Sequence, residues 1–384
     1  MHVLWTPSWY PSPEFPLNGS FFKEQVGMLR DSDIDVGVVW LEPKTFWQWR
    51  KHPIRLDLED KLVHHSFPNV PKGIIPGDYE LIRRHATILA NEYESRWGKP
   101  DVIHAHSVFP GVLVAQILSE RWNVPYGITE HRPSTLQQVE STPRYKRIKR
   151  AVCGANFRIT VSRPIAEKLN EKYGAPFDVC ALPVPDSFFE RPLPERKDQV
   201  TRFVHISGLT PEKRVEETIE AFRAVLDDGT PVRLDIVGGH TSERVEELRK
   251  FVDKLGISGA VKLLGPISRD EMPCVLNHDA FVLYSSVEAG GTSFAEAQSL
   301  GMIVVGSATF AGKFMITPET GIVVPIEGQN ELQNAIKQIA TGQVRFQSSR
   351  IRDVARHRFS AATFSTYHKK IYQTAIDTVQ GAKR

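Results

Sequence analysis

Two glutamates lie eight residues apart in the segment SSVEAGGTSFAEAQSLGMIVVG, residues 285–306. The apolar run before it predicts a strand, a turn carries Glu288, Gly290 and Gly291, and a helix follows with Glu296 in its first turns. Glycines let backbone N–H groups approach a ligand, and a helix N-terminus favours phosphate. Carboxylates accept hydroxyl hydrogen bonds, so the pattern indicates a ligand with phosphate and hydroxyl groups. Two glutamates at this spacing alone also fit a solvated turn and a favourable charge at a helix start.

Other chemically capable side chains follow predicted strands. Lys213 lies in SGLTPEKR, where a compact cation suits a phosphate, and His131 lies in ITEHRPS at a strand end. His104 and His106 straddle another strand end, but no carboxylate or cysteine cluster accompanies them. We therefore favour packing or acceptor contacts over metal ligation for this pair.

Short apolar runs alternate with helical patterns along nearly the whole chain. This alternation predicts parallel sheets covered by helices, an α/β fold with two doubly wound, Rossmann-like domains. In the first half the predicted strands are residues 2–6, 36–41, 101–106, 124–129, 157–162 and 178–182; in the second half they are residues 203–207, 233–238, 261–265, 280–285, 302–306 and 321–325.

The domain boundaries are predicted from a change in composition. Residues 186–199, DSFFERPLPERKDQ, are rich in proline and charge and read as a linker. We predict an N-terminal domain over residues 1–190 and a C-terminal domain over 200–358, with a terminal helix over 360–384 crossing back to the first domain. Ligands bind at the carboxyl ends of the strands in such sheets, so two facing domains predict a central cleft.

Composition excludes several classes of protein. The 384 residues are 41% hydrophobic and 24% charged, as in globular proteins, and the net charge of +3 does not indicate a nucleic-acid partner. No apolar run approaches bilayer length and the start lacks a secretory pattern, so we expect a cytoplasmic protein. Cys153, Cys180 and Cys274 are odd in number and widely spaced, which favours core thiols.

Two local clusters suit an anionic membrane surface. RYKRIKR, residues 144–150, holds five basic side chains, and FWQWRKH, residues 46–52, mixes aromatic and basic ones. A solvated helix face and a partly buried aromatic loop explain the same composition equally well. Peripheral contact with the inner face of the cell membrane is therefore one expectation.

These segments resemble the family 4 glycosyltransferases, whose fold is called GT-B. Glu288 and Glu296 match that family's E-x7-E signature, and the following LGMIVVGSATFAG looks like its G-x-P-V-V-x-S-x-x-x-G stretch. LDIVGG and VKLLGPISRDEM look like two earlier landmarks of the family. The resemblance is strong over residues 203–326 and weaker upstream, where the loop around Gly19 and the strand end at His131 match.

The resemblance implies a role for each matching residue. Glu296 would hold the ribose hydroxyls, Glu288 and the backbone of the next four residues would face the donor sugar, and His131 would approach that sugar. Lys213 would bind the diphosphate, although Gly208 stands where the family usually has arginine. The implied catalytic residues are His131, Lys213 and Glu288; the implied donor-binding residues are Gly19, Gly208, Lys213, Leu264, Pro266, Glu288, Ala289, Gly290, Gly291, Thr292 and Glu296.

The function that the resemblance implies is a retaining, metal-independent transfer of a hexose. The donor is expected to be UDP-glucose or UDP-N-acetylglucosamine, with no further cofactor, and the acceptor a glycan or lipid-linked oligosaccharide in polysaccharide biosynthesis. A nucleotide-sugar epimerase and a non-catalytic nucleotide-sugar-binding protein are the alternatives. A nicotinamide enzyme is disfavoured because no G-x-G-x-x-G follows the first strand.

Overall fold

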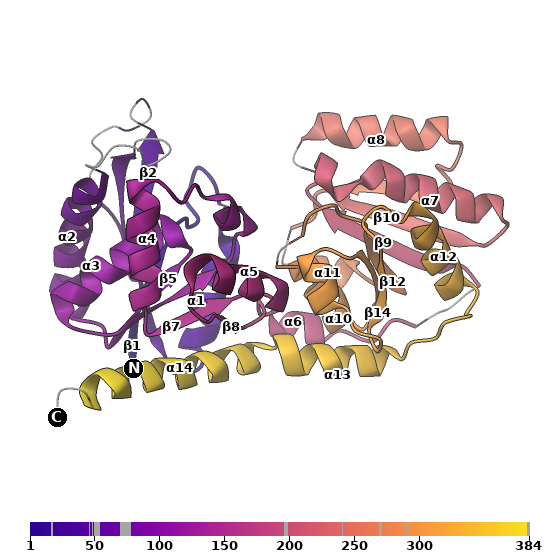
Figure 1. Ribbon diagram of the computed structural model, residues 1–384. Coiled ribbons are helices and arrows are strands. Elements are labelled where there is room, and N and C mark those ends of the chain that lie inside the picture. The colour runs from indigo at the N-terminus through magenta and orange to yellow at the C-terminus, as the bar shows by residue number, and fades with distance from the viewer. Residues whose placement is uncertain are drawn as a thin grey trace. The chain divides into compact units, whose positions relative to one another are not determined.

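The structure is a computed structural model that describes residues 1–16, 18–45, 47, 49, 54–69, 78–195, 199–239, 241–268, 271–288 and 290–381. The described chain divides into two compact units. The first unit is Met1–Ala181 together with Phe364–Arg384, and the second unit is Leu182–Thr363. Both are α/β units built on a mainly parallel sheet, as the alternating pattern predicts (Figure 1).

The sheet of the first unit is wound outward in both directions from β1. Its strands, in spatial order, are β3 (Arg55–Asp57), β4 (Leu62–Asn69), β2 (Asp35–Thr45), β1 (His2–Pro7), β5 (Val102–His106), β6 (Tyr126–Glu130), β7 (Phe157–Thr160) and β8 (Asp178–Val179). The pair β3–β4 is antiparallel and the other described pairs are parallel. The chain therefore reverses its strand order between β1 and β5, the point at which such sheets bind ligands.

Helices cover both faces of this sheet. On one face Trp5 and Phe22 belong to a core that includes Tyr372 of the last helix, and Figure 1 shows that helix, in yellow, running beside the first unit. On the other face α2 packs against β4 and α3. The helical segments of the first unit are α1 (Ser20–Arg30), α2 (Asp78–Trp97), η2 (Val108–Val112), α3 (Leu113–Trp122), η3 (Pro133–Gln137), α4 (Pro143–Gly154), α5 (Arg163–Tyr173) and most of α14 (Ala361–Gly381).

The sheet of the second unit is parallel throughout its described strands. In spatial order these are β11 (Val261–Gly265), β10 (Val232–Gly238), β9 (Thr201–Ser207), β12 (Ala280–Leu283), β13 (Ile303–Ser307) and β14 (Gly321–Val324). Its helical segments are α6 (Asp186–Phe189), η4 (Pro211–Lys213), α7 (Val215–Asp227), α8 (Ser242–Lys254), α9 (Met272–Val275), α10 (Thr292–Ser299), α11 (Phe310–Met315), α12 (Gln329–Ala340) and α13 (Ser348–Phe359). Here the strand order reverses between β9 and β12.

Two expectations from the sequence need correction. The segment predicted as a linker begins with α6, where Phe188 and Phe189 are buried and Arg356 lies over the ring of Phe189. The charged residues and prolines of this segment obscure the apolar signal of these two phenylalanines, which pack within the second unit. The cysteines are not all core thiols either, because Cys153 and Cys274 are exposed on the ends of short helical segments.

The described helices contain no stretch that is both apolar enough and long enough to cross a bilayer.

Candidate functional site

The reversal point of the second sheet brings together two of the predicted residues. Lys213 follows β9 and Glu288 follows β12, and these strands are neighbours although the residues are 75 positions apart. Lys213 Nζ lies 2.6 Å from Glu288 Oε2, with side-chain exposures of 20% and 18%. An ion pair this sheltered holds both side chains at the carboxyl ends of the strands, where α/β sheets bind ligands.

Hydrogen bonds fix the two loops that carry this pair. The backbone N–H of Ser286 donates to the carbonyl of Glu212 at 2.8 Å, which ties the loop after β12 to the loop after β9. Ser207 Oγ accepts from the N–H of Leu209 at 3.1 Å and lies 2.7 Å from Nε2 of His205. Burial, with help from the charge of Lys213, lowers the pKa of His205 to about 3. His205 is therefore neutral near pH 7 and supports the loop without adding charge beside Lys213.

The turn between β12 and α10 needs glycine for reasons of packing. Gly291 precedes α10 with φ +62°, and a Cβ there would lie 2.9 Å from the Cβ of Ala311 and 2.9 Å from the ring of Phe294. The N–H of Ala311 donates to the carbonyl of Glu288 at 3.0 Å, so α11 supports the same turn. The glycine in this motif thus lets the turn pack tightly against α11.

The other predicted donor residues of the second unit lie at the same edge of the sheet. Glu296 is in α10 and is 4% exposed, which is unusual for a carboxylate and requires polar partners. Gly290 and Thr292 are half-buried beside Gly291. Ala289 lies outside the described residues.

Two more predicted donor residues lie at the end of β11, on the far side of β10. Leu264 is 43% exposed and Pro266 is also exposed, so this turn offers an open surface to a ligand. Gly208 is half-buried in the loop between β9 and Lys213. The spatial order of the strands thus spreads the predicted donor residues over the ends of β11, β9 and β12.

Of two side chains that offer a replacement for the arginine expected at Gly208, one is already engaged. The guanidinium of Arg214 donates to the carbonyl of Ile326 at 2.5 Å and to Glu327 at 2.7 Å. Lys313 is exposed on α11. Lys213 and Arg214 are about equally sheltered, with side-chain exposures of 20% and 19%, but Lys213 pairs with Glu288, a predicted donor residue.

The first unit places its predicted residues at its own reversal point. Gly19 precedes α1 with φ +81°, and a Cβ there would lie 2.8 Å from the ring of Trp9. Trp9 and Phe22 also flank His131, with ring centroids 6.4 and 5.3 Å from the imidazole. The glycine loop and the histidine thus share one aromatic neighbourhood.

His131 belongs to a chain of buried rings. Its Nε2 lies 3.0 Å from Nδ1 of His106, and His104 contacts the Tyr372 hydroxyl at 2.7 Å through Nδ1 and Thr129 Oγ1 at 2.8 Å through Nε2. Burial lowers the pKa of His131 to about 3 and those of His104 and His106 well below their usual value. These rings are neutral near pH 7, so His131 offers a hydrogen bond and not a charge.

Sequence reasoning missed Glu130, which fixes the loop that carries His131. This fully buried carboxylate accepts from Ser107 Oγ at 2.7 Å, from the N–H of Val108 at 2.9 Å and from the N–H of Arg132 at 2.8 Å. A carboxylate with three donors rigidifies both strand ends at once. Its position directly before His131, at a strand end, is the signal that marks it in the sequence.

The chemistry available to the second unit is the binding of a polar anion. Lys213 supplies a positive charge, Glu288 supplies one carboxylate, and Glu296 supplies a second carboxylate in α10. Cations bind phosphate and carboxylates bind hydroxyl groups. Within the described residues no three His, Cys, Asp or Glu side chains are grouped to hold a metal ion.

The fold and these sites define a class of two-unit, Rossmann-like α/β proteins with a reversal point in each sheet. Comparison with known families refines this. Residues 21–188 match the family Glycosyltransferase Family 4, and residues 186–358 match Glycosyl transferases group 1. The chain belongs to these glycosyltransferases, and the predicted family is confirmed.

Solved structures of similar fold are glycosyltransferases of the GT-B type. The apo lipopolysaccharide outer core galactosyltransferase WaaB has a TM-score of 0.72 at 16% identity, covering 97% of this chain and all of that one. Anabaena Alr3699/HepE in complex with UDP has a TM-score of 0.71 at 16% identity, and the match covers 97% of this chain and 100% of that one. Sucrose-phosphate synthase from Thermosynechococcus elongatus has a TM-score of 0.70 at 19% identity, and the match covers 98% of this chain and 100% of that one. The predicted GT-B fold is thus confirmed.

A relative in Bacillus subtilis (strain 168) is named as a glycosyltransferase of teichuronic acid biosynthesis, TuaC. It is 26% identical over an alignment of 250 residues, and the match covers 59% of this chain. The match spans 63% of the relative, less than two thirds of its length.

Proposed function

We propose that this protein transfers a hexose from a UDP-linked donor to a glycan or lipid-linked oligosaccharide during polysaccharide biosynthesis. The observation that carries the proposal is the Lys213–Glu288 pair at the reversal point of the second sheet, beside the helix that carries Glu296. UDP supplies a diphosphate for Lys213 and ribose hydroxyls for Glu296. HepE, a solved structure of similar fold, is described in complexes with UDP and with UDP-glucose, which supports this nucleotide and UDP-glucose as the leading donor. UDP-N-acetylglucosamine is the other candidate.

The proposed mechanism retains the anomeric configuration and uses no metal. As the bond to the leaving diphosphate breaks, negative charge grows on the phosphate oxygens, and the ammonium of Lys213 stabilises it. The N-terminus of α10 carries a partial positive charge, which stabilises the phosphate in the same way. Neutral His131 orients the donor sugar by hydrogen bonding, and no residue is assigned as a covalent nucleophile.

The experiment is release of UDP from UDP-glucose and UDP-N-acetylglucosamine, measured with and without a panel of glycan and lipid-linked acceptors. We expect acceptor-dependent release with at least one donor, and product analysis by NMR should show the donor's anomeric configuration. A new sugar epimer formed without acceptor would instead identify an epimerase. Donor binding without turnover over the whole panel would identify a binding protein.

Metal independence has its own test. A chelator such as EDTA should leave the rate of transfer unchanged, because Lys213 and backbone N–H groups neutralise the leaving group in this proposal. A large loss of activity that Mn²⁺ or Mg²⁺ restores would contradict it.

The proposed location is the cytoplasmic face of the membrane. Lys146, Lys149 and Arg150 are exposed on α4, and Trp47 is 91% exposed. Most of the aromatic segment 46–52 lies outside the described residues, which include Trp47 and Trp49. Sedimentation with vesicles of anionic lipid should decrease with rising salt, since charge drives the contact. Failure to sediment at low salt would refute the association.

A further inference from the structure

Two adjoining cavities lie in the first unit. The larger has a volume of about 630 Å³ and the smaller about 300 Å³, and Phe109, Gln138 and Arg144 line both. Together they have the size of a site for a sizeable small molecule. Both lie beside the segment that follows β6 and carries His131, so this edge of the first sheet offers one continuous site.

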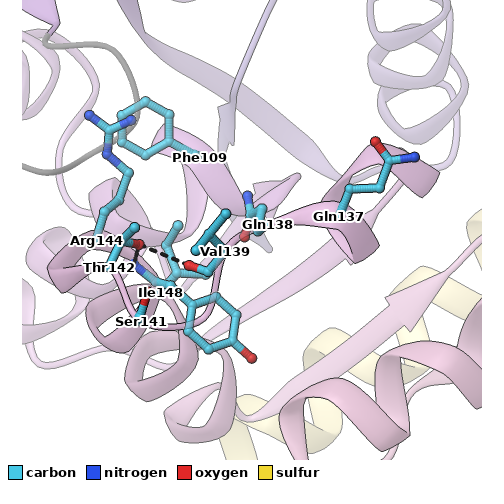
Figure 2. Close-up of a pocket in the computed structure, with 9 residues that line it drawn as sticks. Phe109, Gln137, Gln138, Val139, Ser141, Thr142, Arg144 and Ile148 are labelled. Atoms are coloured by element: carbon cyan, nitrogen blue, oxygen red, sulfur yellow. Dashed lines mark hydrogen bonds between the residues drawn. The ribbon is translucent and has the colours of Figure 1, made fainter.

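The two cavities differ in chemistry. The larger has apolar walls formed by Phe109, Val139 and Ile148, which are among the lining residues drawn in Figure 2. The smaller is lined mainly by polar groups, including Ser8, Ser134, Thr135, Asn69 and Arg132. The site therefore changes from polar to apolar along its length, as an amphiphilic ligand requires.

The charge of Arg144, on the shared wall, is already balanced inside the protein. Its Nε donates to Asp78 at 2.7 Å, an aspartate that is 5% exposed, and its second guanidinium nitrogen donates to Asn69 at 2.8 Å. The guanidinium lies over the ring of Phe109 at 4.1 Å (Figure 2). Arg144 thus holds the wall between the cavities in place.

Arg132, in the smaller cavity, forms no such ion pair with any of the described residues. Its guanidinium lies over Trp9 at 4.4 Å, and its one hydrogen bond to an oxygen of the described residues, the carbonyl of Phe109, is long at 3.5 Å. Its Nε is buried without a partner, and no carboxylate of the described residues lies within ion-pair distance. The charge of the nearby Glu130 acts on this guanidinium without direct contact, because that carboxylate accepts from the backbone N–H of Arg132 and from two other donors. A sheltered guanidinium with no carboxylate in contact is a binding site for an anion.

We propose that the two cavities form one acceptor site for a glycosyl phosphate joined to an apolar chain, with the phosphate at Arg132 and the chain along Phe109, Val139 and Ile148. This rests on the proposed function, for which it names the class of acceptor. The guanidinium fork matches phosphate oxygens in two-point contact, and the apolar walls remove the chain from water. A sugar carboxylate is the alternative anion for Arg132.

The test is isothermal titration of the full chain, without donor, with four probes below their micelle concentrations. The probes are glucosyl decyl phosphate, decyl glucoside, glucose 1-phosphate and decyl glucuronide. We expect glucosyl decyl phosphate to bind most tightly, at least about tenfold above each of the other three, because it alone contacts both cavities with a phosphate. Equal affinity for decyl glucuronide would overturn the phosphate in favour of a carboxylate.

Two variants separate the two halves of the site. Arg132→Gln should weaken the binding of glucosyl decyl phosphate by roughly 10- to 100-fold. It should leave the affinity for decyl glucoside within about threefold of that of the unmodified protein. Arg147→Gln is the matched control, since Arg147 is a half-buried cation stacked on Tyr79 at 4.3 Å that lines neither cavity. An equal loss with Arg147→Gln, or an equal loss for the uncharged glucoside in Arg132→Gln, would overturn the assignment.

Val139→Asn tests the apolar half. Val139 is 65% exposed, so the variant should fold, and it should weaken the binding of all three decyl probes about tenfold while sparing that of glucose 1-phosphate. Val275→Asn, at a 41% exposed valine of the second unit, should change nothing. Titration of UDP into the same preparations separates the proposals: UDP binding without binding of glucosyl decyl phosphate refutes the acceptor site alone, and absence of UDP binding refutes the proposed donor.

Discussion

Replacing Glu288 by glutamine removes the negative charge that faces Lys213 in the unliganded protein. Lys213 Nζ and Glu288 Oε2 are 2.6 Å apart and each side chain is about one-fifth exposed. Breaking a fully buried pair costs about 3–5 kcal/mol, and breaking an exposed one about 0–1 kcal/mol. At this exposure we expect Glu288→Gln to lower the free energy of unfolding of the second unit by about 1–2 kcal/mol, and its Tm by about 2–8 °C.

UDP should reverse this loss, because its diphosphate gives Lys213 a new partner and UDP carries no hexose for Glu288 to contact. Differential scanning calorimetry with and without saturating UDP measures both effects. We expect a larger UDP-induced rise in Tm for Glu288→Gln than for the unmodified protein, and a smaller rise for Lys213→Met.

The control is Glu327→Gln, which breaks the neighbouring Arg214 pair at 2.7 Å where Glu327 is 81% exposed. Its effect on Tm should be small, since exposed pairs contribute little. A Glu288→Gln variant that unfolds at the Tm of the unmodified protein would refute a stabilising role for this ion pair. A UDP-induced rise in Tm that is as small for that variant as for Lys213→Met would contradict diphosphate binding by Lys213.

Three further predictions concern the first unit. His131→Ala should reduce turnover far more than UDP affinity, as measured by steady-state kinetics and titration, and equal losses would contradict an orienting role. Acidification should unfold the first unit before the second: burial lowers the pKa of His131 to about 3 and of His368 to about 4, so the unfolded state gains protons below about pH 6.5 while the native rings stay neutral. Each ring then lowers the stability by up to about 1.4 kcal/mol per pH unit, and calorimetry from pH 7 to 5 that shows the second unit unfolding first would refute this. Tyr372→Phe, which removes the hydroxyl bonded to His104 and Trp5, should destabilise the first unit by about 1–3 kcal/mol in urea unfolding; no change would show that α14 contributes nothing through this contact.

The sheets could be predicted because their strands are apolar runs set in an alternating order. β1, β2, β5 and β9 to β14 lie where the sequence pattern places them. The short β3 and its antiparallel partner β4 were not predicted, because strands paired at a sheet edge bury only one face and leave a weak apolar signal. The buried Phe188 and Phe189 of α6 were hidden by the charges and prolines around them.

The candidate site was only partly predictable. The family signature marks Glu288 and Lys213 separately, but their contact depends on β9 and β12 being neighbours, which follows from strand order. The cavities in the first unit could not be predicted from the sequence. They depend on whether Arg132 and Arg144 find carboxylate partners, and Asp78, which neutralises Arg144, is 66 residues away.

The central claim is that the second unit binds UDP through Glu296 and Lys213, and titration of UDP tests it most directly. We expect saturable binding to the unmodified protein and at least a roughly tenfold loss in Glu296→Ala, because charge-assisted hydrogen bonds to the ribose contribute about 1.5–3 kcal/mol each. Glu319→Ala, which breaks only the exposed pair with Arg350, should bind UDP normally. Unchanged UDP affinity in Glu296→Ala would contradict the account.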